Sequence, residues 1–201
     1  MEAFEIPGVP GRFNWHNTPV EWSLDPSRGL LIVAGPQTDW FYDPAGGYSA
    51  DTAPCALSTV QDANFLLSTR ISVKFASAYD AGVIQIRAAD NMWAKFCYEY
   101  SPQGHPTIVS VVTRDVSDDC NSVEIDDTQV YLRVARTPQT LAFHYSRDGN
   151  VWHLVRYFTL GMFSSLQIGF SAQSPTGTLC TAVFSEMNYR PGSLKDLRSG
   201  E

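Results

Sequence analysis

The side chains best suited to chemistry in this chain alternate along one short run. Trp93, Lys95 and Glu99 are separated by even numbers of residues, so in a β-strand they share one face. A tight turn at residues 89–91 would bring Gln85 and Arg87 of the preceding run onto the same face. An indole stacks on the C–H face of a sugar, whereas amide, guanidinium and carboxylate groups bind its hydroxyls. The spacing therefore suits a saccharide; the alternative is an ordinary salt-bridged sheet surface.

Two further clusters are candidates for the same site. Asp39 and Trp40 lie among adjacent aromatic residues, some of which we expect to be exposed because neighbours on a strand point to opposite faces. Asp115 and Asp118 belong to an acidic segment after another strand. Acids there are typical turn formers, and the sequence has no D-x-D-x-D-G loop, so we predict no metal site. A bulge near Arg114 would exchange its face with that of Asp115.

The candidates for catalysis are carboxylates without an obvious partner. A glycosidase needs two acids a short distance apart, and Glu99 has no acid two or four residues away on its own strand. Asp115, Asp118 or Glu186 could supply a partner only through the fold. His144 alternates with apolar neighbours, so we expect it to be exposed and include it among the binding residues. The chain has no G-x-S-x-G, H-E-x-x-H or phosphate-binding loop, which favours a non-catalytic protein without a cofactor.

The elements that must position these residues are β-strands. Residues 65–75 alternate between apolar and polar, as do 130–136, 141–147 and 166–170, and Gly, Pro, Asn and Asp clusters separate such runs. Asp148-Gly149 between two apolar runs predicts a hairpin. We predict an all-β, two-sheet antiparallel β-sandwich of jelly-roll type. It forms one domain over residues 1–201, with a core at about 12–190 and a polar tail at 191–201. Gly161–Ser165 and Ser193–Gly200 are the only helix candidates.

Composition limits the classes of partner. The chain has 201 residues, 44% hydrophobic and 12% aromatic, which is enough to build a core unaided. Its net charge of −7, with basic residues scattered, argues against nucleic acid as a partner. We also predict no membrane span and no secretory signal, and hence a cytoplasmic protein. The four cysteines lie far apart, and Cys97 is expected to be a buried free thiol.

An ordered set of segments resembles a known family. The segments are TDW at 38–40, AGVIQIRAADNMWAK at 81–95, YEY at 98–100, SVVTRDVSD at 110–118, YSRDGNVW at 145–152 and GFSAQSP at 169–175. Together they resemble the regulation-of-enolase protein family of the concanavalin A-like lectin/glucanase superfamily, from about Trp15 to Tyr189. Residues 146–152 also resemble the Asp-box turns of sialidases, which stabilise a β-turn.

The resemblance implies a sandwich with one sheet curved around a groove. The glucanase motif E-x-D-x-x-E is absent, and the calcium ligands of lectins have no match here. What carries over is a polar set that the resemblance places at the groove: Asp39, Trp40, Arg87, Trp93, Lys95, Glu99, Arg114, Asp115 and Asp118.

Three functions follow as hypotheses. The first is a non-catalytic module that binds a saccharide or another small polar ligand in the groove, with Trp40 and Trp93 stacking on the sugar. The second is a carbohydrate-active enzyme, glycoside hydrolase-like, that uses Glu99 with an aspartate partner. The third is a regulatory protein whose partner is a glycolytic enzyme such as enolase, which predicts exposed aromatic residues near Asp39.

Overall fold

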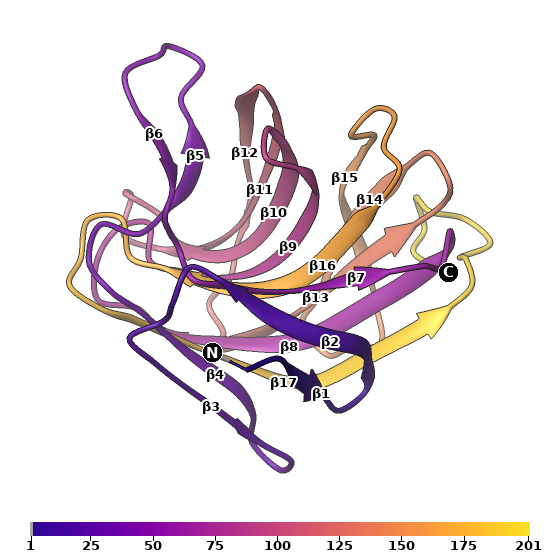
Figure 1. The fold of residues 1–201 in the computed structure, drawn as a ribbon, viewed down its shortest axis with the longest axis horizontal. Coiled ribbons are helices and arrows are strands. Elements are labelled where there is room, and N and C mark those ends of the chain that lie inside the picture. Colours follow the sequence, from indigo (N-terminus) through magenta and orange to yellow (C-terminus); the bar gives the residue numbers. More distant parts are fainter. Residues whose placement is uncertain (1) are drawn as a thin grey trace.

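The protein is built from two stacked antiparallel β-sheets, as the computed structural model of residues 2–201 shows (Figure 1). One sheet has eight strands, in the spatial order β1 (Phe4–Ile6), β2 (Val9–His16), β7 (Cys55–Val60), β16 (Leu166–Gln173), β9 (Ala81–Ala89), β10 (Met92–Tyr100), β11 (Pro106–Arg114) and β12 (Val116–Glu124). The predicted two-sheet antiparallel sandwich is confirmed. Among the described residues, no helix is long and apolar enough to cross a membrane.

The second sheet has seven strands and packs against the inner face of the first. Its order is β15 (His153–Phe158), β14 (Leu141–Ser146), β13 (Gln129–Arg136), β8 (Phe65–Lys74), β17 (Cys180–Pro191), β4 (Gly29–Ala34) and β3 (Glu21–Asp25). A separate hairpin of β5 (Trp40–Tyr42) and β6 (Ser49–Asp51) stands over the outer face of the eight-stranded sheet, which is curved toward it (Figure 1).

The main core lies between the two sheets. Alternate residues of each strand point inward, so the aromatic rings of one sheet meet those of the other. Phe96 of β10 stacks on Phe143 of β14, with ring centroids 4.6 Å apart, and Phe170 of β16 packs on Phe184 of β17 at 5.1 Å. Burying each such ring contributes about 1.5–3 kcal/mol. The opposite residues of β9 and β10 are thereby turned to the outer face.

The Asp148-Gly149 hairpin forms as predicted between β14 and β15. The Asp148 carboxylate accepts hydrogen bonds from the backbone N–H groups of Asn150 (2.8 Å) and Val151 (2.9 Å) and from the Ser146 hydroxyl (2.9 Å). These bonds hold the pKa of Asp148 below its usual range. Gly149 has φ 76°, which glycine adopts without strain. The motif is structural, as its Asp-box resemblance implies.

The sandwich includes strands near the N-terminus but neither of the two predicted helices. β1 and β2 extend the eight-stranded sheet, and β2 tolerates Pro10 and Gly11 near the edge of that sheet. Neither Gly161–Ser165 nor Ser193–Gly200 is helical. Gly161 has φ 92°, outside the helical range.

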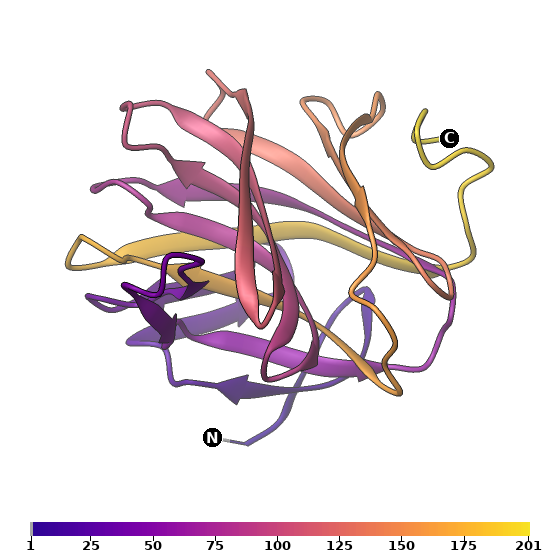
Figure 2. The same cartoon turned by 90° about the horizontal axis from the view of Figure 1, so that it is seen from above.

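The C-terminal tail lies beside β13 and β14, as both ribbon views show (Figures 1 and 2). Leu194 and Leu197 pack against a small apolar cluster that includes Leu66, Ala135 and Ala142. The polar tail is therefore attached to the outer face of the seven-stranded sheet.

Candidate functional site

The register of β9 and β10 assembles the predicted patch on the outer face of the eight-stranded sheet. Lys95 lies opposite Gln85, and Trp93 lies opposite Arg87, as the tight turn between the strands predicts. Glu99 follows on the same face of β10. The cross-strand grouping read from the sequence is therefore confirmed, although its use differs from the expectation.

The two tryptophans are buried and cannot stack on a ligand. Trp40 is 2% exposed and Trp93 is 0% exposed. Their rings meet edge to face at 5.6 Å beneath the β5–β6 hairpin, and the Trp40 indole N–H donates to the Ala53 carbonyl at 2.9 Å. The expected role in sugar stacking is thus wrong, because the hairpin turns the outer face into a second, smaller core. We call this group around Trp40 and Trp93 the tryptophan cluster.

A pocket of 380 Å³ lies at one side of the tryptophan cluster, and we call it the acid pocket. Its charged and amide groups come from the loop before β5 and from β10, β12 and β16, and its rim is aromatic. The lining consists of Asp39, Phe41, Tyr48, Tyr79, Lys95, Glu99, Val111, Asp119, Gln173, Pro175 and Thr176. Three carboxyl groups therefore share this space with one ammonium group.

Lys95 is the fixed cation of the acid pocket. Its Nζ donates to Asp39 Oδ1 at 2.9 Å and to Gln173 Oε1 at 3.0 Å, and the side chain is 4% exposed. Gln173 in turn donates through Nε2 to the carbonyl of Tyr79 at 3.1 Å. Burial opposes the charge of Lys95, but the surrounding negative groups, Asp39 foremost, hold its pKa above the ordinary value. One ammonium N–H is left for a ligand.

Glu99 is the unpartnered acid of the pocket. The residue is 7% exposed, and none of the described residues donates a hydrogen bond to its carboxyl group. Burial raises the pKa of Glu99 to about 8, with Lys95 opposing the shift. Burial also raises the pKa of Asp119. At neutral pH the Glu99 carboxyl is therefore largely protonated and can donate as well as accept a hydrogen bond.

The exposed rings at the acid pocket are Tyr48 and Tyr79. They are 46% and 40% exposed, so a face of each is available to a ligand. Tyr79 has φ 70°, an unusual backbone conformation for a bulky residue that costs about 1–2 kcal/mol. Its N–H donates to the Tyr100 carbonyl at 2.7 Å, which helps hold it there. Strained residues of this kind cluster at ligand sites.

Asp119, and not the predicted acids, faces the pocket. Asp119 pairs with Val111, which lies opposite Lys95, so these three residues form one row across the sheet. Asp118 points to the other face and makes an ion pair with Arg156 of β15 at 2.9 Å. Because side chains alternate along β12, Asp118 and Asp119 must point to opposite faces, but only the register with β11 shows which of them faces the pocket.

The remaining predicted residues lie elsewhere. Arg114 and Asp115 are exposed at the turn between β11 and β12, where Asp115 has φ 65° and accepts a hydrogen bond from the Asn91 amide at 2.5 Å. Neither lines the acid pocket. Gln85 is 0% exposed, and neither end of its amide has a partner among residues 2–201.

His144 is buried, which contradicts the expected exposure. It lies on the outer face of β14, as its alternation predicts, but the C-terminal tail covers that face. One ring nitrogen, Nε2, is 2.7 Å from the Leu197 carbonyl. Burial lowers the pKa of His144 to about 4, so the ring is neutral at physiological pH. It is far from the acid pocket and belongs to the attachment of the tail.

The aromatic residues that directly follow Asp39 in the sequence are not exposed, so the exposed rings near Asp39 are Tyr48 and Tyr79 at the rim of the acid pocket. Trp40 is buried, and Phe41 and Tyr42 are half-buried against the tryptophan cluster. Within residues 2–201, no group of three or more His, Cys, Asp or Glu side chains could hold a metal ion. All four cysteines in this part of the chain are free thiols, and Cys97 is buried as expected.

Residues 15–192 match a family model described as "Protein of unknown function (DUF1349)". The chain belongs to the DUF1349 family. No curated protein matches it by sequence. The family description carries no activity, so the expected link to enolase stays a prediction.

Several solved structures share the fold of this DUF1349 protein. A functionally unknown protein from Saccharomyces cerevisiae has 24% identity and a TM-score of 0.80, covering 90% of this chain and 96% of the other. The GH43 protein BlXynB from Bacillus licheniformis has 16% identity and a TM-score of 0.69, covering 92% of this chain but 38% of the other. The carbohydrate binding module CBM66 from Bacillus subtilis has 13% identity and a TM-score of 0.57, covering 88% and 94%.

Proposed function

We propose that this DUF1349 protein is a binding module that holds a neutral saccharide in the acid pocket. The observation that carries the proposal is Glu99, a carboxyl group that is 7% exposed, has no hydrogen-bond donor among the described residues and lines a pocket of 380 Å³. Buried polar groups normally have partners, so such a group suits a ligand that supplies them.

The chemistry of the pocket supports a polyhydroxylated ligand. Asp39 and Asp119 can accept hydrogen bonds from hydroxyl groups, whereas Lys95 can donate one. Glu99 can do either, because its pKa is raised to about 8. Three carboxyl groups against one ammonium disfavour an anionic ligand. The faces of Tyr48 and Tyr79 can stack on the apolar side of a sugar ring.

The comparisons support the same class of ligand without identifying it. CBM66, which shares the sandwich fold, is a carbohydrate binding module by its own description. A shared fold by itself does not carry a function, so the residues of the acid pocket carry the proposal.

The test is calorimetric titration with xylose, glucose, galactose and fructose, comparing the wild type with Tyr79→Ala. We expect at least one sugar to bind, and Tyr79→Ala to weaken it about three- to ten-fold. Tyr157→Ala is the matched control, since Tyr157 is 50% exposed on β15 of the other sheet. The proposal would be refuted if the folded wild type bound none of the sugars, or if Tyr79→Ala bound them as tightly as Tyr157→Ala does.

The acid pocket also supports a glycoside hydrolase as a second candidate, with Asp119 in place of the predicted Asp115 or Asp118. The observation in its favour is that Glu99, whose pKa is raised to about 8, shares the pocket with a second acid. A protonated acid beside a carboxylate is what glycoside hydrolysis requires. Glu99→Gln should then abolish turnover of an aryl glycoside while the sugar still binds. If the wild type binds the sugar without turnover, the hydrolase is excluded and the binding module is the remaining function.

A further inference from the structure

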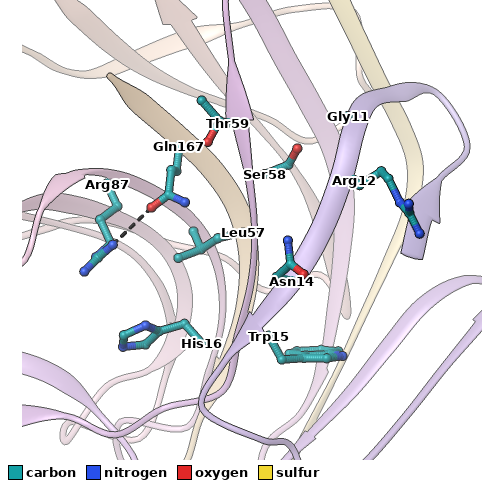
Figure 3. Close-up of a pocket in the computed structure, with 10 residues that line it drawn as sticks. All are labelled: Gly11, Arg12, Asn14, Trp15, His16, Leu57, Ser58, Thr59, Arg87 and Gln167. Atoms are coloured by element: carbon teal, nitrogen blue, oxygen red, sulfur yellow. Dashed lines mark hydrogen bonds between the residues drawn. The ribbon is translucent and has the colours of Figure 1, made fainter. Parts of the chain in front are cut away.

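A second pocket of 390 Å³ lies on the same sheet face, at the other side of the tryptophan cluster. It extends over β2, β7, β16 and β9 (Figure 3). We call it the basic hollow, because Arg12, His16 and Arg87 are among its lining residues and no carboxylate is. Leu57 lines the basic hollow and belongs to the tryptophan cluster. Val111 belongs to the same cluster but lines the acid pocket. The two pockets are therefore separate sites.

Arg87 is the cation held in place within the basic hollow. Its side chain is 17% exposed, and Nη1 donates to Gln167 Oε1 at 3.0 Å (Figure 3). Nη2 donates to Asp90, whose side chain is 95% exposed, and Nε is buried without a partner in the described part of the chain. A guanidinium has five N–H groups, so one N–H remains on each terminal nitrogen. Arg12 and Trp15 extend away from Arg87 (Figure 3).

Further donors surround this guanidinium. Gln167 uses its oxygen to accept from Arg87, which leaves its Nε2 amide group without a partner among the described residues. His16 lies nearby, with its ring 5.1 Å from that of Trp40. Asn14 and Thr59 add an exposed amide and an exposed hydroxyl at the rim. The hollow is thus rich in hydrogen-bond donors, in contrast to the acid pocket.

We propose that the basic hollow binds a carboxylate, of the kind carried by a uronic acid or another sugar acid, between Arg87 and His16. Arginine recognises carboxylates through paired N–H groups. Arg12 extends away from this space, so the permanent positive charge between Arg87 and His16 is that of Arg87 alone, which suits a monoanion better than a dianion. Leu57 gives the floor an apolar surface on which the rest of the ligand can lie.

The state of His16 agrees with this assignment. Burial lowers the pKa of His16, and Arg87 lowers it further, while Asp51 and Asp90 oppose the shift. The ring is therefore mainly neutral at pH 7 and adds a donor but no charge. An anion placed between the two residues would favour the protonated ring, so its binding should raise the pKa of His16.

The test is an NMR titration of the His16 ring signals with sodium glucuronate, glucose and inorganic phosphate. We expect glucuronate to bind, to raise the pKa of His16 and to bind more tightly than phosphate, while glucose leaves these signals unchanged. Arg87→Gln should weaken glucuronate binding at least about ten-fold. Equal responses to glucuronate and glucose, tighter binding of phosphate, or unchanged affinity in Arg87→Gln would overturn the proposal.

Two further variants keep the test decisive if Arg87→Gln does not fold. Asp90→Asn removes the exposed carboxylate that competes for Arg87, so glucuronate should bind more tightly, by up to about five-fold. Gln167→Glu places a carboxylate inside the hollow and should abolish binding. No change in either variant would exclude the site. Sugar binding at the acid pocket is followed separately by calorimetry with neutral sugars, so either proposal can fail without the other.

Discussion

The acid pocket and the basic hollow occupy one face of one sheet, yet they have opposite character. The acid pocket has Asp39, Glu99 and Asp119 around a single lysine, whereas the basic hollow has Arg87 and His16 and no carboxylate. The tryptophan cluster lies between them. The difference shows that one curved sheet can hold two unlike polar sites. The β5–β6 hairpin covers the sheet between them, and the tryptophan cluster beneath it forms an apolar wall that separates the two pockets.

The largest expected effect comes from removing this wall. Trp93→Ala deletes a fully buried indole that packs against Trp40 and Tyr42, and should lower the free energy of unfolding by about 4 kcal/mol. Urea denaturation measures the loss. The matched control is Tyr157→Ala, which removes an exposed ring and should cost less than about 1 kcal/mol. A Trp93→Ala protein as stable as the wild type would mean that the two pockets are not divided by a packed core.

The next effect tests the single cation of the acid pocket. Lys95→Met leaves the Asp39 carboxylate buried without its 2.9 Å partner, which should cost about 3 kcal/mol. Asp39→Asn in the same protein removes the stranded charge, so the double variant should recover part of the loss. A double-mutant cycle by denaturation measures the coupling. Additive losses would show that the two groups do not interact.

The pH dependence of stability should distinguish Glu99 of the acid pocket from His16 and His144. The folded protein keeps a proton on Glu99 between pH 4.5 and about 8, where the unfolded chain has released it. The free energy of unfolding should therefore fall as pH rises through this interval. Glu99→Gln should remove that slope.

The histidines act in the opposite direction. The pKa of His16 and that of His144 are lowered, so their contributions are present above pH 6.5 and are lost as pH falls below it. Comparing Glu99→Gln with His144→Gln in denaturation series from pH 4 to 9 separates the two trends. A Glu99→Gln profile that matches the wild type would show that Glu99 is ionised at neutral pH.

The smallest effect concerns the rim of the acid pocket. Tyr79→Gly relieves the positive φ of 70° and should stabilise the fold by about 0.5–1 kcal/mol, while it removes a ring from the proposed sugar site. Tyr157→Gly, in the strand β15, should instead destabilise by a similar amount. Thermal denaturation distinguishes the signs. A destabilised Tyr79→Gly would show that the ring is held for packing and not for a ligand.

Much of this architecture could be predicted from local patterns. Alternation set the faces of β10, so that Lys95 and Glu99 share one side, and the tight turn placed Lys95 opposite Gln85. The Asp148-Gly149 hairpin followed from turn chemistry. Each of these features depends on residues that are close in the sequence.

The sequence by itself determined which side chains point away from the main core, because that parity belongs to the backbone of each strand. Only the tertiary structure decided what covers them. The β5–β6 hairpin buries Trp40 and Trp93, the tail buries His144, and the register of β12 selects Asp119 over Asp118. The reason is that coverage and register arise from contacts between segments far apart in the chain, and alternation along one strand carries no information about them.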